Sequence, residues 1–254
     1  MKLFFRKSGE GKPLIILHGL FGMSDNWMTL SKQFAAEGFL VYAVDLRNHG
    51  RSPHSNDFNY SIMSDDLLSL IDDEHISSAS IIGHSMGGKT AMWFACVQPD
   101  RVSKLIIADM APRYYPPHHQ SVFAAIHAVD LDSLTTRKEV EGILRESLKQ
   151  EGTIQFLLKN LYWNEQEKLA WRFYLEGIEE NISSIGIALP EQYHCDAETL
   201  FLRGEKSGYI TDADIVEIRK QFTHASVATV ANAGHWIHAE NPTGFMEEVR
   251  KFLV

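Results

Sequence analysis

Short apolar segments bounded by turn residues alternate along most of the chain with longer segments whose apolar residues recur at helical spacing. This alternation is typical of a parallel sheet whose strands are connected by helices. The sequence therefore predicts a doubly wound, mostly parallel α/β fold. The predicted strands cover residues 3–6, 14–17, 40–44, 79–82, 105–108, 199–202 and 226–230.

The alternation stops after Asp109, where three prolines open a stretch without strand-like segments. We therefore expect a core domain formed by residues 1–111 and 191–254, with a helical lobe of residues 112–190 inserted after the strand that ends at Asp109. At 254 residues, the chain has the length of one large α/β domain. Within the lobe, six apolar residues fit one face of a helix: Trp171, Tyr174, Leu175, Ile178, Ile182 and Ile185.

The sequence Gly-His-Ser-Met-Gly-Gly at residues 83–88 lies between a predicted strand and a predicted helix. A GxSxG turn at such a junction raises the serine oxygen above the sheet, and its glycines let the strand and the helix approach closely. Ser85 is therefore predicted to be a nucleophile. The alternative is a serine that only caps the helix at a glycine-rich turn.

The same residues, continued through Lys89 and Thr90, also match the phosphate-binding pattern GxxxxGK[ST]. Asp109, at the end of the next apolar run, would then bind magnesium. Three predicted strands precede the one that leads into this motif, whereas a phosphate loop usually follows an early strand. A nucleotide hydrolase therefore stays an alternative.

Two further loops fit acyl transfer. His-Gly-Leu-Phe-Gly at residues 18–22 follows a predicted strand, and an oxyanion needs one backbone N–H donor from such a loop and one from the residue after the nucleophile. Leu20 and Met86 are the expected donors. His235 follows the last predicted strand, and the ordinary pKa of an imidazole suits it to accept and return a proton near neutral pH. We therefore predict His235 as the base, and His238 as a packing group rather than a metal ligand.

The composition narrows the choice of partners. A net charge of -9 disfavours binding to nucleic acid or to an acidic membrane surface, and the two cysteines, Cys96 and Cys195, form neither a zinc-binding pattern nor a disulfide framework. No apolar stretch approaches the roughly 18 residues of a membrane span, and the charged N-terminal residues do not resemble a signal peptide. We expect a cytoplasmic monomer or homodimer with no metal, no other cofactor, no nucleic acid and no membrane as a partner.

With HGLFG, DLRNHGRS, GHSMGG and GHWIHAENP in this order, the chain resembles the α/β-hydrolase superfamily over nearly its whole length. HGLFG, the run QFLLKNL at residues 155–161 and AGHWIHA at residues 233–239 look more narrowly like the YbfF-type esterases and their abhydrolase-domain relatives. This resemblance implies an α/β-hydrolase sheet of eight strands, the second one weak here, a helical cap over the active site, and hydrolysis of short acyl esters or thioesters.

Most α/β-hydrolases carry the triad acid after the strand that follows the cap, and Ser207 occupies that place in this chain. A hydroxyl group cannot stabilise an imidazolium as an anion does. Asp109, which ends the neighbouring predicted strand, is therefore predicted to be the acid. The YbfF resemblance implies the same displaced aspartate with a helper serine, here Ser207. Two alternatives stay open: Glu205 as the acid, and Asp109 as a cap of the turn into Pro112.

These residues predict a two-step acyl transfer in which Ser85, His235 and Asp109 hydrolyse a small-molecule ester or thioester of short to medium acyl chain. Two other functions stay open: the nucleotide hydrolase, and a receptor that keeps a hydrolase pocket without significant turnover. Four residues on segments that converge at the site are expected to line the substrate pocket: Phe21, Met110, Trp163 and Trp236.

Overall fold

The computed structural model describes residues 1–253, and its core is a seven-stranded sheet in the order β1-β3-β2-β4-β5-β8-β9. The strand β1 at one edge runs antiparallel to its neighbour β3, and the other strands run parallel. The strands are β1 (Phe5–Ser8), β2 (Lys12–Leu17), β3 (Phe39–Val44), β4 (Ala79–His84), β5 (Val102–Ala108), β8 (Thr199–Gly204) and β9 (Ala225–Val230).

The mostly parallel α/β fold is confirmed, and six of the seven observed strands contain all the residues predicted for them. The first strand is displaced, because residues 5–8 pair with β3 whereas residues 3–6 were expected. The implied count of eight strands is wrong for the part of the chain that the structure describes, where the sheet has seven.

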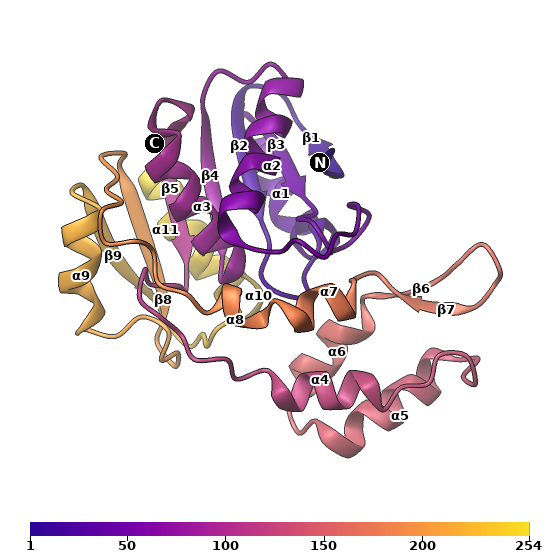
Figure 1. Ribbon diagram of the computed structural model, residues 1–254. Helices are drawn as coiled ribbons and strands as arrows, with labels where there is room; N and C mark the ends of the chain where they lie inside the picture. The colour runs from indigo at the N-terminus through magenta and orange to yellow at the C-terminus, as the bar shows by residue number, and fades with distance from the viewer. Residues whose placement is uncertain (254) are drawn as a thin grey trace.

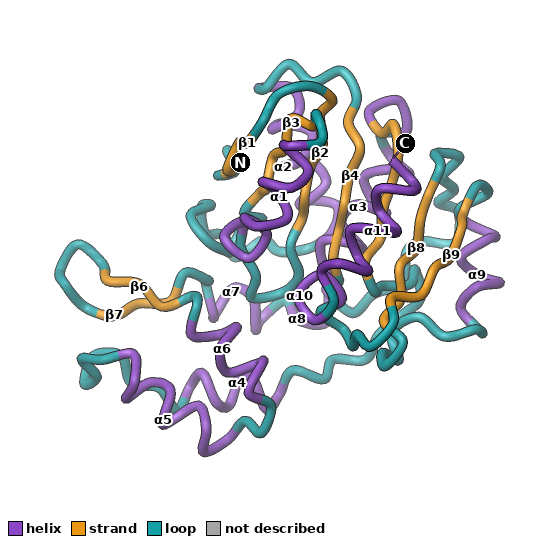
Figure 2. Tube along the Cα trace, turned by 180° about the vertical axis from the view of Figure 1, so that it is seen from behind, coloured by secondary structure: helices purple, strands orange, loops and turns teal. Residues whose placement is uncertain are grey.

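Helices cover both faces of the sheet. Figure 1 shows α2 (Tyr60–Asp73) and α3 (Met86–Val97) in front of it, and Figure 2 shows α1 (Met28–Ala36) and α11 (Pro242–Leu253) on the opposite face. Apolar side chains of α1 and α11 form one buried cluster with inward residues of the strands. Those of α2, α3 and α9 (Asp214–Gln221) belong to a second cluster, which continues into the inserted lobe. The inserted lobe and the core domain are therefore packed together through one continuous apolar core.

The inserted lobe, here called the cap, lies below the carboxyl ends of the strands (Figure 1). Its helices are α4 (Gln120–His127), α5 (Arg137–Ser147), α6 (Glu151–Leu158), α7 (Leu175–Glu180) and α8 (Ile182–Ile185). It also contains an antiparallel hairpin of β6 (Leu161–Trp163) and β7 (Leu169–Trp171), which extends away from the core in both views. Short helical turns lie beside the core strands, at Ser24–Trp27, Pro99–Arg101 and Ile237–Glu240 (α10).

Two expectations for the cap are wrong. The cap is mostly helical, but the expectation that it contains no strands is wrong, because residues 161–163 and 169–171 pair as the hairpin. The single helix expected between Trp171 and Ile185 is instead a strand end followed by two short helices, since Trp171 ends β7 and Asn181 interrupts the helix between α7 and α8. Apolar residues at helical spacing do not show where a helix is broken. Among residues 1–253, no helix combines the length and the apolar character needed to cross a bilayer.

Candidate active site

Ser85 lies on the sharp turn between β4 and α3. Its backbone has φ 52° and ψ -117°, a conformation that non-glycine residues rarely adopt. The glycines on either side permit this turn, because a Cβ atom on Gly83 would lie 2.3 Å from the Gly87 carbonyl oxygen and one on Gly87 would lie 2.4 Å from the Leu17 carbonyl oxygen. The strand and the helix thus approach as the GxSxG pattern predicts, and the Ser85 hydroxyl group faces a cavity.

A serine, a histidine and an aspartate are joined by hydrogen bonds at this point. His235, which lies between β9 and α10, places its Nε2 atom 3.0 Å from the Ser85 Oγ atom and its Nδ1 atom 2.8 Å from the Asp109 Oδ2 atom. Since an ionised carboxylate can only accept, Nδ1 carries the proton and Nε2 is free to accept the Ser85 hydroxyl proton. The Asp109 side chain is fully buried. This is the arrangement that a serine nucleophile with a histidine base needs.

Asp109 follows β5, and its position depends on the adjacent strand β8. Its backbone N–H donates to the Leu202 carbonyl oxygen over 2.7 Å, and its Oδ1 atom accepts from the Gly204 N–H over 3.0 Å. The Ser207 hydroxyl group donates to its Oδ2 atom. Parallel strands that are neighbours end at the same edge of a sheet, which brings the two loops together. Glu205, the alternative acid, instead accepts a hydrogen bond from the Asn232 N–H over 2.7 Å on the exposed side of the turn.

The loop at residues 18–22 forms a tight turn closed by a 2.8 Å hydrogen bond from the Gly22 N–H to the Gly19 carbonyl oxygen. Phe21 occupies the third position of this turn, with φ 59°. The amides of Leu20 and Met86 have no hydrogen-bond acceptor within the described part of the chain, and both residues line a cavity beside Ser85. Their free N–H groups suit the role of oxyanion donors.

Two buried histidines fix this loop, and sequence reasoning did not identify them. The His18 Nδ1 atom donates to the Gly19 carbonyl oxygen over 2.8 Å, and the His49 Nε2 atom accepts from the Phe21 N–H over 3.0 Å. Burial lowers the pKa of His18 to about 4 and that of His49 to about 3, so both rings are neutral near pH 7. In the same region, Asp45 accepts from the Ser24 and Arg51 backbone amides, a structural role.

Aromatic rings surround the His235 imidazole. The Tyr209 ring stacks on it with the centroids 3.8 Å apart and the planes 19° apart, and the His84 Nε2 atom donates to the His235 carbonyl oxygen over 2.9 Å. His238 stacks flat on Trp27, with the centroids 4.0 Å apart, and burial lowers the pKa of His238 to about 3. His238 is thus a neutral packing group, and no group of three or more His, Cys, Asp or Glu residues suited to a metal ion occurs in residues 1–253.

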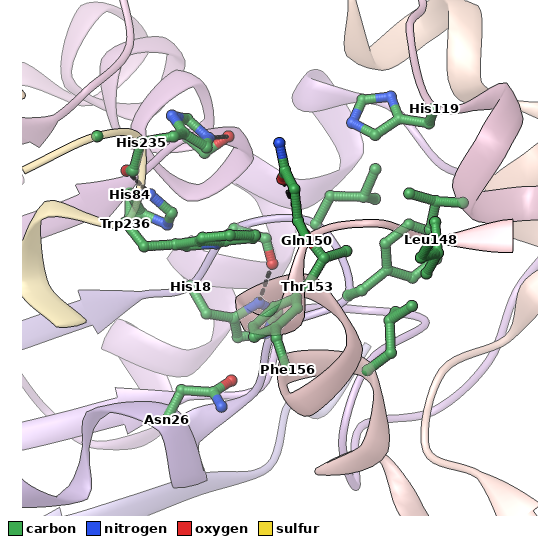
Figure 3. Close-up of a pocket in the computed structure, with 18 of the residues that line it drawn as sticks. His18, Asn26, His84, His119, Leu148, Gln150, Thr153, Phe156, His235 and Trp236 are labelled. Carbon is green, nitrogen blue, oxygen red and sulfur yellow. Dashed lines mark hydrogen bonds between the residues drawn. The ribbon is translucent and has the colours of Figure 1, made fainter. Parts of the chain in front are cut away.

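A cavity of about 850 Å³ opens at Ser85 between the core and the cap. Figure 3 shows His84, His235 and Trp236 on its core side and Leu148, Gln150, Thr153 and Phe156 on its cap side. A second cavity, of about 30 Å³, also borders Ser85. Its lining includes Met86, Met110, residues 115–119, and Ile182 and Ile185 of α8.

Three of the four residues expected to line the pocket do so. Phe21 and Trp236 line the large cavity, and Met110 lines the small one. The expectation for Trp163 is wrong, because this residue ends β6 in the protruding hairpin, 52% of its surface is exposed, and it borders neither cavity. The sequence around Trp163 did not reveal that the hairpin of β6 and β7 turns away from the core.

Lys89 decides against the phosphate-loop alternative. Its side chain is buried, and its ammonium group donates to the carbonyl oxygens of Pro112, Arg113 and Ile187 over 3.3, 2.7 and 2.9 Å. These carbonyl groups belong to the two chain segments at the base of the cap. Lys89 therefore fastens the cap to the core, and its ammonium group does not face a site for a phosphate.

Comparisons with known proteins agree with this fold. The family model described as alpha/beta hydrolase fold matches residues 12–242. The chain is 36% identical to esterase YbfF of Escherichia coli over 96% of this chain and 94% of that protein, and 37% identical to the zebrafish sn-1-specific diacylglycerol lipase ABHD11 over 98% of this chain and 80% of that protein. A solved structure described as a marine microorganism esterase has 42% sequence identity and a TM-score of 0.96, with 99% of both chains covered. With a match to the family over most of its length and relatives of this similarity, the chain belongs to the α/β hydrolase family.

Proposed function

We propose that this protein is a serine esterase that hydrolyses uncharged esters of short-chain acids through an acyl-enzyme intermediate on Ser85. The observation that carries the proposal is the unbroken line of hydrogen bonds from Ser85 through His235 to the buried Asp109. A receptor that binds a ligand without hydrolysing it would need neither these hydrogen bonds nor the free amides beside Ser85. Two of the similar proteins are an esterase and a lipase, which supports the same class of reaction.

In the proposed mechanism the Ser85 Oγ atom attacks the ester carbonyl carbon while His235 Nε2 takes the hydroxyl proton. The Leu20 and Met86 amides bind the negative oxygen that forms, and the Asp109 carboxylate stabilises the imidazolium. The imidazolium then returns its proton to the departing alcohol. Water repeats the sequence on the acyl-enzyme and releases the acid, so that no cofactor takes part.

The position of His235 relative to the two cavities indicates which cavity holds the alcohol half of the ester and which holds the acyl half. The leaving alcohol takes its proton from His235, so it must lie on the His235 side of Ser85. His235 lines the large cavity and not the small one. We therefore assign the alcohol to the large cavity and the acyl chain to the small cavity, whose lining is mostly apolar.

The size of the small cavity limits the acyl chain. A water-sized group needs about 10–15 Å³ of such space, so a cavity of about 30 Å³ holds two or three groups of this size. Together with the carbonyl carbon, this corresponds to acids of up to about four carbons.

Lys149 is the one lysine or arginine among the residues that line the large cavity, which favours an uncharged alcohol over a leaving group with several phosphates, such as coenzyme A.

A panel of p-nitrophenyl acetate, butyrate and octanoate tests this assignment. We expect kcat/KM for butyrate or acetate to exceed that for octanoate at least tenfold, and Ile182→Ala to raise the octanoate-to-acetate ratio by widening the small cavity. Thr153→Ala, in the large cavity, is the matched control and leaves the ratio unchanged. A preference for octanoate that Thr153→Ala alters and Ile182→Ala does not would reverse the assignment. An inactive wild-type enzyme would refute the esterase proposal itself.

A further inference from the structure

Asn160 lies in the cap between α6 and β6, and its side chain reaches the loop that carries the Leu20 amide. Its Nδ2 atom donates to the Phe21 carbonyl oxygen over 2.9 Å and to the Phe156 carbonyl oxygen over 3.4 Å. Two carbonyl acceptors identify this atom as the amide nitrogen, since a side-chain oxygen would face them unfavourably. The residue is 1% exposed, so this hydrogen bond is shielded from water.

Phe21 is held by groups from both parts of the molecule. The core supplies His49, whose Nε2 atom accepts from the Phe21 N–H. The cap supplies Asn160 at the carbonyl oxygen, and two rings at the side chain: Phe123 and Phe173, with centroids 5.8 and 5.0 Å from the Phe21 ring. The cap therefore provides three of these four contacts.

Phe21 needs such support because of its backbone conformation. At φ 59° it occupies the left-handed region, which is unfavourable for a residue with a side chain. Phe21 is the third residue of the turn closed between Gly19 and Gly22, the position that takes a positive φ in a type II turn. A change in the Phe21 backbone would disturb the turn closed from Gly19 to Gly22, and this turn sets the direction of the Leu20 amide at its second position.

We propose that Asn160 is a positioning residue: by holding the Phe21 carbonyl group it keeps the Leu20 N–H aimed at the oxyanion, so that the oxyanion hole is complete only when the cap is seated on the core. This proposal rests on the proposed esterase function. It also gives a role to the run QFLLKNL, in which Asn160 is the one residue whose side chain bonds to the catalytic loop.

The test uses two variants of similar size. Asn160→Asp places an acceptor against the Phe21 carbonyl group, and Asn160→Leu removes the donor. Removal of an oxyanion donor lowers kcat by about 10² to 10³, so a misdirected donor is expected to lower kcat about 10- to 100-fold. The KM for p-nitrophenyl acetate should change less than threefold, because the ground-state ester depends little on this donor.

The readout that separates positioning from a purely structural role is the affinity for a tetrahedral mimic. A trifluoromethyl ketone, which adds to the serine hydroxyl group, should bind about 10- to 100-fold more weakly to both variants, in proportion to the loss in kcat/KM. Arg137→Met is the matched control, because Arg137 donates to the Leu158 and Leu161 carbonyl oxygens in the same part of the cap and makes no hydrogen bond to residues 18–22. It should keep kcat within twofold.

The outcomes are distinct. If both Asn160 variants keep kcat and ketone affinity within threefold of an active wild type, the proposal is wrong and the esterase function stands. If Arg137→Met loses as much as they do, general cap stability explains the loss and the proposal is also wrong. If Asn160→Leu does not fold, Asn160→Asp, which has nearly the same shape, decides alone. Wild-type inactivity would refute the proposed function instead.

Discussion

Replacing Asp109 by asparagine should nearly abolish activity and leave the fold intact. Asp109 accepts three hydrogen bonds, from the Gly204 N–H on one oxygen and from Ser207 and His235 on the other. An asparagine that keeps the bond to Gly204 must turn its NH₂ group toward His235 Nδ1. The imidazole then carries its proton on Nε2, where it can donate to Ser85 but cannot accept the hydroxyl proton.

The same change of tautomer in a protease triad lowers kcat by about 10⁴, and we expect a loss of about 10³ to 10⁴ here, or about 4 to 5.5 kcal/mol of transition-state stabilisation. The assay is kcat on p-nitrophenyl acetate at pH 8, with a thermal unfolding curve to establish that the fold persists. Glu205→Gln is the control, because Glu205 contacts the Asn232 amide and not His235. An Asp109→Asn enzyme that is folded and retains more than a tenth of its activity would refute the reasoning.

Three further predictions concern groups around the triad. Ser207→Ala should lower kcat only about 3- to 30-fold, because Asp109 keeps its charge and its bond to His235; steady-state kinetics would detect a larger loss, which would make Ser207 more than a helper. Lys89→Met should reduce the free energy of unfolding by about 2 to 4 kcal/mol in urea titrations, because three buried carbonyl groups lose their donor. Binding of magnesium-ATP to the wild-type protein would contradict this structural role of Lys89. The pKa values of His18 and His49 are about 4 and about 3 in the folded chain, below the ordinary value of 6.5, so the unfolded chain binds more protons at acidic pH. The free energy of unfolding should therefore fall as pH falls from about 6.5 toward 4, by up to about 1.4 kcal/mol per pH unit for each ring. Equal free energies of unfolding at pH 7.5 and pH 5 would argue against buried neutral rings.

The sequence predicted the core well because its signals are local. Each of the six strands after β1 coincides with a short apolar segment of the sequence, and the turn at Ser85 requires glycines at fixed spacing. The neighbouring ends of β5 and β8 follow from parallel pairing, so the placement of Asp109 beside residues 204–207 could be inferred from the sequence.

The groups that the sequence did not reveal depend on contacts between distant segments. His49 and Phe21 are 28 positions apart, and Asn160 and Phe21 are 139 positions apart, so no local pattern joins them. The outward direction of the hairpin that carries Trp163 likewise depends on how the cap packs, and helical spacing alone did not show where α7 and α8 separate. Stacking of Tyr209 on His235 belongs to the same class of long-range contact.

Intact mass after treatment with a fluorophosphonate tests the central claim most directly, because this reagent phosphonylates a serine that an adjacent base activates. We expect one adduct per chain, located on Ser85 by peptide mapping, and none on Ser85→Ala, which should also lose esterase activity. An adduct on another residue, or a Ser85→Ala enzyme that still hydrolyses p-nitrophenyl acetate at the wild-type rate, would contradict the account.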